Sequence, residues 1–148
     1  FKKGYKEKCG EFDKLTIKYE KCNTKGLVEG FADIIKEELT LLAEQIFQRN
    51  IGIIDCWSIS YDKNDYHITH NHSSTGITGI LYLDLPEESP VTTYIQPWND
   101  FISDTTFFNE IPVSEGTMII TPSFVMHYSS PNKSKDKKRV ISWDMKIQ

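Results

Sequence analysis

A change in hydrophobic period divides this chain into a helical part and a β part. From Leu27 to Phe47, apolar residues recur every three or four positions with charged residues between them, which predicts one amphipathic helix of about five turns. After Ile51 no second segment of this quality occurs, and short β-type runs alternate with Pro, Gly, Asn and Ser. This order predicts a mainly β fold with an N-terminal helix, in which about seven or eight strands form a small barrel or sandwich and the helix packs on an outer face.

The predicted strands occupy most of the chain after the helix. They are Ile51–Tyr61, Ile77–Leu85, Val91–Ile95, Thr117–Thr121, Val125–Ser129 and Val140–Ile147. The first two dozen residues fit a short edge strand or a turn-rich lead-in equally well. We expect a single domain over residues 1–148, with the lead-in and supporting helix in residues 1–50 and the barrel in residues 51–148.

Length, charge and hydropathy restrict the class of protein. The chain has 148 residues, of which 39% are hydrophobic and 26% charged, as in an ordinary globular domain. Its net charge of -4 gives no reason to expect a nucleic-acid partner. No apolar run approaches the roughly 20 residues that span a bilayer, and no signal peptide is visible. We therefore expect a cytoplasmic protein without a membrane partner, and the absence of an initial Met is compatible with a piece of a longer chain.

The cysteines do not form a recognisable framework. They are Cys9, Cys22 and Cys56, an odd number without CxxC spacing, which argues against both a disulfide scaffold and a zinc–thiolate site. Reduced thiols are the simplest interpretation, and one bridge between Cys9 and Cys22 is left open.

The four histidines carry the strongest chemical signal. His67, His70 and His72 lie within six residues, and His127 lies in a later β-type run. Residues i and i+2 of a strand face the same side, so His70 and His72 can direct two imidazole nitrogens to one point. Neutral imidazole is a common metal ligand, and His127 is the one distant histidine that can complete a set of three. The alternatives are a strand of merely exposed histidines, or a third ligand from Asp62 or Asp65.

At this point the sequence resembles a known family. The segments YDKNDYHITHNHSSTGITGILYLDLP and IPVSEGTMIITPSFVMHYSSPNKSKDKKRVISWDMKI are similar to the two metal-binding halves of 2-oxoglutarate/Fe(II)-dependent dioxygenases. The nearest group is one of 2-oxoglutarate/Fe(II) oxygenases frequent in marine bacteria and phages, and a phage-encoded member would work in the host cytoplasm. The resemblance covers about residues 55 to 147 and implies a double-stranded β-helix, the jelly-roll barrel that cupins share.

The resemblance also implies a metal centre. His70 and His127 fall on the two metal-binding histidines of the fold, and His72 falls where most members have Asp or Glu. The usual ligand set is two histidines and one carboxylate, which leaves metal positions open for a cosubstrate. An imidazole in place of the carboxylate raises the net charge of the site by one. The implied cofactors are Fe(II), 2-oxoglutarate and O2, with 2-oxoglutarate decarboxylated to succinate while a substrate is oxidised.

The cosubstrate residues are likewise implied by the resemblance. Arg139 falls on the basic residue that pairs with the distal carboxylate of 2-oxoglutarate, and a guanidinium can donate two parallel hydrogen bonds to it. Tyr82 falls where a strand tyrosine donates to the same carboxylate, and Tyr61 falls where another tyrosine borders the cosubstrate. Arg139 also closes the charge run Lys133–Arg139, which by itself predicts a solvated turn. The apolar residues that follow predict a strand entering the core.

Two other classes compete with the oxygenase. A cupin shares the barrel, the HxH pair and a spacing that Gly116, Pro122 and His127 reproduce, but it also has a Glu shortly after the HxH, where this chain reads SSTGI. A barrel that keeps a metal without turnover would be a non-catalytic module of a larger assembly. The sequence names neither the substrate nor the oligomeric state, because the specificity of such enzymes lies in loops.

Overall fold

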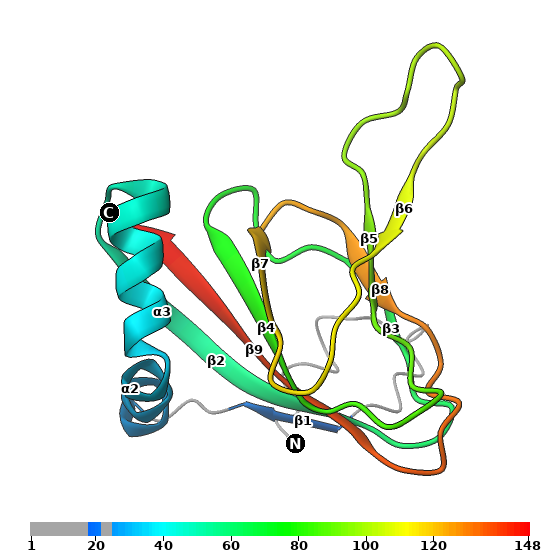
Figure 1. The fold of residues 1–148 in the computed structure, drawn as a ribbon, viewed down its shortest axis with the longest axis horizontal. Helices are drawn as coiled ribbons and strands as arrows, with labels where there is room; N and C mark the ends of the chain where they lie inside the picture. The colour runs from blue at the N-terminus through cyan, green and yellow to red at the C-terminus, as the bar shows by residue number, and fades with distance from the viewer. Residues whose placement is uncertain (1–17, 22–24) are drawn as a thin grey trace.

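A computed structural model describes residues 18–21 and 25–148 of the chain. It contains two antiparallel sheets and a helical segment that lies beside one of them (Figure 1). Cys9 and Cys22 lie outside the described residues, and Cys56 is buried. The helical elements are α2 (Lys25–Ile34), α3 (Lys36–Leu41) and the π-helical segment η1 (Leu42–Phe47). The strands are β1 (Lys18–Lys21), β2 (Ile51–Tyr61), β3 (His67–His70), β4 (Ile77–Asp84), β5 (Thr92–Ile95), β6 (Phe108–Glu110), β7 (Met118–Pro122), β8 (His127–Ser129) and β9 (Lys138–Ile147).

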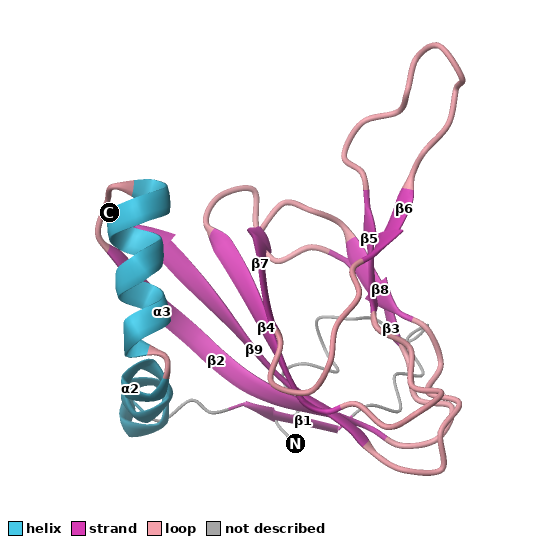
Figure 2. Ribbon diagram, viewed as in Figure 1, coloured by secondary structure: helices cyan, strands magenta, loops and turns pink. Residues whose placement is uncertain are grey.

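The strand order is that of a double-stranded β-helix. The larger sheet has the order β1-β2-β9-β4-β7 and the smaller sheet the order β3-β8-β5-β6 (Figure 2). From β2 onward the chain passes back and forth between the two sheets, so that residues distant in sequence become neighbours. The expected jelly-roll fold is confirmed.

The larger sheet buries apolar residues on both faces. Its inner face, toward the smaller sheet, carries a cluster that includes Ile59, Tyr82 and Val140. Its outer face packs against the helical segment, where the rings of Phe31 and Trp143 meet edge to face at 5.0 Å. Because side chains alternate along a strand, β9 contributes its even-numbered residues to the inner face and its odd-numbered residues to the outer face.

The prediction that Leu27–Phe47 forms one continuous helix is wrong. Ile35 has φ −103° and ψ 22°, so α2 and α3 are separate helices whose axes differ in direction (Figure 2). Ile34 and Ile35 are consecutive β-branched residues, which fit a helix less well than unbranched ones. Ile35 is buried against the outer face of the sheet, while Ile34 is exposed. The left-handed residue that ends the segment is Gln48, at φ 50°.

The predicted strands are found, with shifted bounds and three additions. β9 begins at Lys138, two residues before the predicted start, because its pairing with β2 extends to Tyr61 opposite Lys138. β3 and β6 are additional strands of four and three residues, too short for a periodic signal. β1 is a further edge strand, so the lead-in contains the edge strand that the pattern left undecided.

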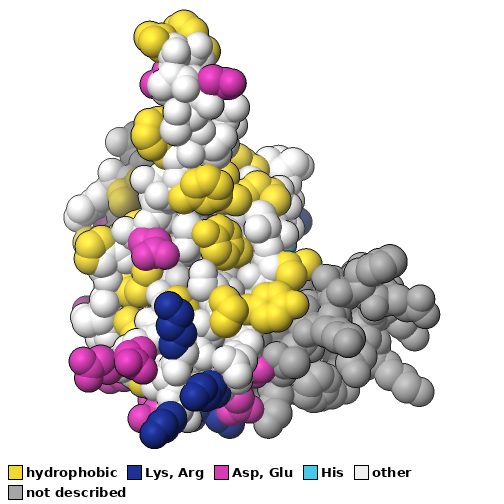
Figure 3. All heavy atoms as spheres, turned by 90° about the vertical axis from the view of Figure 1, so that its right-hand side faces the viewer, with side chains coloured by type: hydrophobic (Ala, Val, Ile, Leu, Met, Phe, Trp, Pro, Cys, Tyr) yellow, Lys and Arg dark blue, Asp and Glu magenta, His cyan; other side chains and the backbone are white. Residues whose placement is uncertain are grey.

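The connection between β5 and β6 forms an arm that stands away from the two sheets (Figure 1). Asp100 organises its tip by accepting hydrogen bonds from the Ile102 N–H at 3.0 Å and the Ser103 hydroxyl at 2.8 Å. Apolar side chains of the arm are nevertheless exposed, among them Trp98 and Phe101, and Figure 3 shows apolar groups at its tip and base. The arm is thus an ordered loop with an apolar surface.

Gly79 on β4 lies against the indole of Trp143, and we predict that it cannot be replaced by alanine without loss of stability. An added Cβ would lie 2.1 Å from the nearest ring carbon of Trp143. Overpacking of this kind should lower the free energy of unfolding of Gly79→Ala by about 1–3 kcal/mol. Urea denaturation measures the change. Gly52→Ala, where the added Cβ meets nothing within 4 Å, is the matched control and should stay within about 0.5 kcal/mol of the parent.

Candidate metal centre

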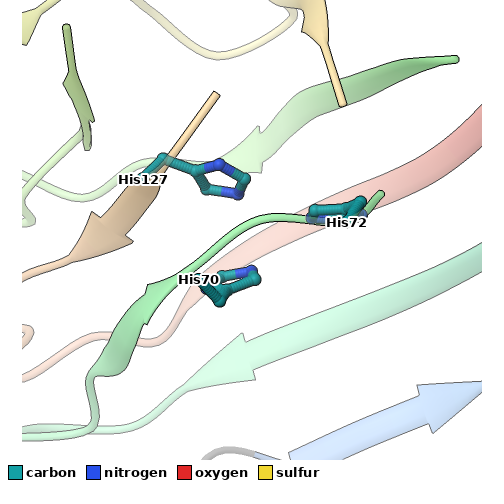
Figure 4. A group of neighbouring side chains, drawn as sticks. All are labelled: His70, His72 and His127. Atoms are coloured by element: carbon teal, nitrogen blue, oxygen red, sulfur yellow. The ribbon is translucent and has the colours of Figure 1, made fainter. Parts of the chain in front are cut away.

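Three histidines converge between the two sheets (Figure 4). One ring nitrogen from each of His70, His72 and His127 lies within 4.8 Å of the others. His70 ends β3 and His127 begins β8, and the two are direct partners in the antiparallel register. The pairing of β3 with β8 therefore brings together residues 57 positions apart, from 70 to 127.

His72 reaches this point by a different route from the one predicted. β3 ends at His70, so His72 lies in the segment after the strand and the i, i+2 rule does not place it. Its backbone N–H donates to the Ser123 carbonyl at 3.0 Å, and this bond fixes the segment beside β7. The Trp57 indole stacks on the His72 ring, with centroids 5.3 Å apart. The two histidines still share one site, although not one strand.

The second nitrogen of each ring is already engaged. His70 Nδ1 lies 2.8 Å from the Ile68 carbonyl and His127 Nδ1 lies 3.0 Å from the Val125 carbonyl. His72 Nδ1 lies 2.9 Å from a carboxylate oxygen of Asp144. Carbonyl and carboxylate oxygens only accept, so each Nδ1 carries the proton and each Nε2 keeps its lone pair. This pattern of outer hydrogen bonds is typical of metal-bound histidines.

Burial keeps His67, His70 and His127 neutral. Desolvation, followed by repulsion from His127, lowers the pKa of His70 to about 4. Desolvation also lowers the pKa of His127. The fourth histidine, His67, stacks on His70 with ring centroids 3.9 Å apart, and burial together with the neighbouring histidines lowers its pKa to about 2. At neutral pH these imidazoles are therefore uncharged and can act as ligands.

The alternative ligands Asp62 and Asp65 are not part of this group. Asp65 accepts a hydrogen bond from the Asp62 N–H at 2.9 Å, which closes the turn after β2. The Asp62 carboxylate pairs with Lys137 at 3.1 Å. Among the described residues, the histidines alone form the group that could hold a metal.

The structure places Arg139 outside the barrel. Its side chain is exposed and pairs with Asp84, and this carboxylate raises the pKa of the guanidinium. The preceding residue, Lys138, points inward instead and is 1% exposed. The expectation that Arg139 enters the site therefore does not fit its orientation, because adjacent residues of a strand face opposite sides. Lys138 is the buried cation, and the run Lys133–Arg139 is not uniformly solvated.

Polar and aromatic groups surround the Lys138 ammonium, and no carboxylate of the described residues pairs with it. Its ammonium donates to the Pro90 carbonyl at 2.7 Å and to the Ser129 hydroxyl at 2.8 Å. It lies 4.7 Å from the ring centroid of Tyr61 and 5.9 Å from that of Tyr82. No ion pair to Lys138 is found within residues 18–21 and 25–148, and desolvation lowers its pKa to about 8. Buried charges are normally paired, so an inward cation of this kind suits an anionic ligand.

Tyr61 and Tyr82 are both buried beside this cation. The Tyr82 hydroxyl donates to the Thr92 hydroxyl at 2.9 Å and accepts from the Thr92 N–H at 3.0 Å. Desolvation raises the pKa of the Tyr82 phenol. Both hydrogen bonds hold Tyr82 in place against β5, so that its ring forms part of the wall around Lys138.

Sequence reasoning missed Lys138, Trp57 and Asp144 as neighbours of the site. Strand alternation groups Lys138 with Val140, Ser142 and Asp144, and this grouping was available from the sequence. It does not say which face is inside, because the more apolar face of β9, that of Ile141, Trp143 and Met145, is the one that packs against the helices.

A surface cleft borders the metal centre on the side of His72, the one of the three histidines that lines it. Its volume is about 550 Å³, and its lining includes His72, Ser73, Ser123, Asp144 and Lys146. A small molecule can thus approach His72 and Asp144 from solvent.

Comparison with known proteins assigns this arrangement to a family. Residues 55–144 match the family model described as "Putative 2OG-Fe(II) oxygenase". No curated protein matches the sequence significantly. No described helix is long and apolar enough to cross a membrane.

Solved structures share the fold at low sequence identity. The non-heme alpha-ketoglutarate-dependent epimerase SnoN from nogalamycin biosynthesis matches with a TM-score of 0.69 and 13% identity over 88% of this chain and 61% of that one. A 2OG-Fe(II) oxygenase family oxidoreductase from Burkholderia pseudomallei matches with a TM-score of 0.65 and 10% identity over 79% and 56%. A SnoN structure in complex with Fe3+, alpha-ketoglutarate and nogalamycin RO matches with a TM-score of 0.67 and 14% identity over 87% and 62%. The chain thus spans about three fifths of the structures that it matches.

The donor set fits iron, and we predict that it depends on His127 and not on His67. Three imidazoles whose Nε2 atoms keep their lone pairs suit Fe(II) as well as Zn(II), Ni(II) and Cu(II). His127→Ala should abolish stoichiometric Fe(II) binding, measured anaerobically by competition with a chromophoric chelator. His67→Gln alters a buried histidine beside the same cluster and should retain one iron per chain. Stoichiometric iron in His127→Ala would exclude the three-histidine site.

Proposed function

This chain belongs to the 2OG-Fe(II) oxygenase family, a family of oxidoreductases, and from this premise we propose that it is a 2-oxoglutarate- and Fe(II)-dependent dioxygenase. The reaction would be a hydroxylase-type oxidation coupled to decarboxylation of 2-oxoglutarate to succinate. The observation that supports it best is the presence of two features in one barrel, three converging histidines and a buried cation, Lys138, that forms no ion pair with any described residue.

His70, His72 and His127 would hold the iron. When bound, the metal supplies a redox-active Lewis acid on which a 2-oxo acid and O2 can react. The protein's own part is to fix the three imidazoles through their Nδ1 hydrogen bonds and to keep His70 and His127 neutral by burial. The surrounding apolar and aromatic groups, such as Trp57 and Tyr94, exclude water from this space.

Lys138, rather than Arg139, would bind the distal carboxylate of 2-oxoglutarate. Two of its three ammonium protons are donated to Pro90 and Ser129, and the third is left for a ligand oxygen. Ser129 lies two residues after His127 on the same face of β8, a separation of about 7 Å along the strand. A five-carbon dicarboxylate can bridge such a distance between the metal and the cation. Tyr61 and Tyr82 would border the cosubstrate through their rings.

The substrate itself is a separate question. The solved structures with this fold include an epimerase and a carbocyclase, so the fold supports different reactions. We propose a small-molecule cosubstrate and a cytoplasmic location, because the ferrous iron that this family uses suits a reducing compartment. We favour the cupin hypothesis less, because the family match covers both metal-binding segments.

The direct test is anaerobic titration of the Fe(II)-loaded protein with 2-oxoglutarate. A saturable visible charge-transfer band is expected, because a 2-oxo acid chelated to Fe(II) absorbs weakly in this region. Succinate formation on admission of O2 would follow as the second readout. Bound iron without a band would instead favour a non-catalytic barrel.

Substitutions of the two neighbouring cations should affect the affinity for 2-oxoglutarate differently. Lys138→Met should weaken 2-oxoglutarate binding by at least about thirtyfold, since loss of one partner of a buried charged pair costs about 2–5 kcal/mol. Arg139→Ala should leave the affinity nearly unchanged, because exposed ion pairs contribute little. The titration above measures both variants. Equal affinities in Lys138→Met and the parent would return the assignment to Arg139.

The affinity for 2-oxoglutarate should also fall with rising pH. The pKa of Lys138 is lowered to about 8, so the ammonium that attracts the carboxylate is present below this pH and is lost above it. We expect about tenfold weaker binding for each pH unit above 8, in titrations between pH 6.5 and 9.5. Lys138→Arg keeps its charge over this whole range and should bind with a flat profile. A parent protein with the same flat profile would argue against Lys138.

A further inference from the structure

Asp144 distinguishes His72 from the other two histidines. His70 and His127 each donate from Nδ1 to the carbonyl two residues earlier, at Ile68 and Val125. His72 instead donates to a carboxylate from β9, 72 positions later in the chain. The one imidazole that stands at the usual carboxylate position of the family is therefore the one that contacts a carboxylate.

We propose that Asp144 is a positioning residue that supplies, through the ring of His72, the negative charge that the three-histidine ligand set lacks. This inference rests on the proposed iron site. A carboxylate that accepts a hydrogen bond from a metal-bound imidazole fixes the tautomer and makes the ligand nitrogen more basic. The charge of a 2-His-1-carboxylate centre is thus restored one hydrogen bond further from the metal.

Asp144 is held for this role by the neighbouring strand. Its carboxylate accepts a hydrogen bond from the Thr78 hydroxyl at 2.8 Å, and Thr78 is its direct partner in the β4–β9 register. Asp144 therefore extends from the inner face of the larger sheet. The contact with Thr78 sets the orientation of its carboxylate before any metal binds.

The contact is part of a closed ring of hydrogen bonds. The Thr78 hydroxyl also contacts the Ser123 hydroxyl at 2.9 Å, and the Ser123 carbonyl accepts from the His72 N–H at 3.0 Å. Thr78 and Ser123 are buried, so water competes little for these bonds. The ring joins the backbone and the imidazole of His72 to the same carboxylate.

Two substitutions separate the charge of Asp144 from its shape. Asp144→Asn keeps the size and a carbonyl acceptor but removes the charge, and Asp144→Ala removes both. We expect about 10- to 100-fold weaker Fe(II) binding in both variants, the range found when such outer partners are lost. Co(II), which reports its ligands through visible absorption, should show shifted bands in Asp144→Asn. Asp84→Asn removes a carboxylate of the same sheet that pairs with Arg139, and should change neither quantity.

The cleft beside Asp144 allows a chemical rescue. Formate can enter from solvent and occupy the space that Asp144→Ala opens next to His72. It should restore most of the lost Fe(II) affinity in Asp144→Ala, while Asp144→Asn, whose side chain fills the space, should not respond.

The outcomes separate this inference from the proposed function. A parent protein without stoichiometric iron would overturn the iron site and with it the role of Asp144. Stoichiometric iron in the parent with equal affinity in Asp144→Asn would leave the oxygenase intact and exclude the charge role. Weak binding in Asp144→Asn with full affinity in Asp144→Ala would show that Asn misdirects His72, and would also overturn the inference.

Discussion

The pairing of β9 with β2 on one side and β4 on the other is the constraint on which the rest of the structure depends. The outward side chains of β9, Trp143 and Met145, join the sheet to the helices. Its inward side chains, Lys138 and Asp144, stand near opposite ends of the strand. One strand therefore anchors the core and also separates a cationic end of the barrel from an anionic one.

The barrel therefore has a positive group near one end and a negative group near the other. The ammonium of Lys138 lies among the tyrosines, and the carboxylate of Asp144 lies beside the imidazole of His72. In the proposed function, a dicarboxylate cosubstrate would be attracted to the first, and a divalent cation would be favoured by the second. In a low-dielectric interior such fixed charges act more strongly than at the surface. Binding of the metal and of the cosubstrate can thus be tuned by different residues.

The sequence predicted the β fold, the approximate strands and the three histidines, because these depend on local patterns. Alternation and turn residues mark strands, and histidines are rare enough for a cluster to be conspicuous. The choice of Lys138 over Arg139 depends on which face of β9 is inside, and the more apolar face, that of Ile141, Trp143 and Met145, is the one that packs against the helices. The partner of His72 depends on a contact between residues 72 and 144, which only the register of the folded sheet establishes. The bend at Ile35 likewise follows from packing against the sheet.

The adjacency of Lys138 and Arg139 has a consequence for how this chain can change over time. The turn before β9 is held to the barrel by Asn132, whose side-chain amide donates to the Tyr61 carbonyl at 3.1 Å and to the Asp136 carbonyl at 3.0 Å. A shift of one position inside the strand would turn Arg139 inward and Lys138 out to solvent. Two successive cations therefore keep a positive group in the barrel after such a slip, whereas the Asp144 end has Trp143 and Met145 as neighbours and has no comparable substitute.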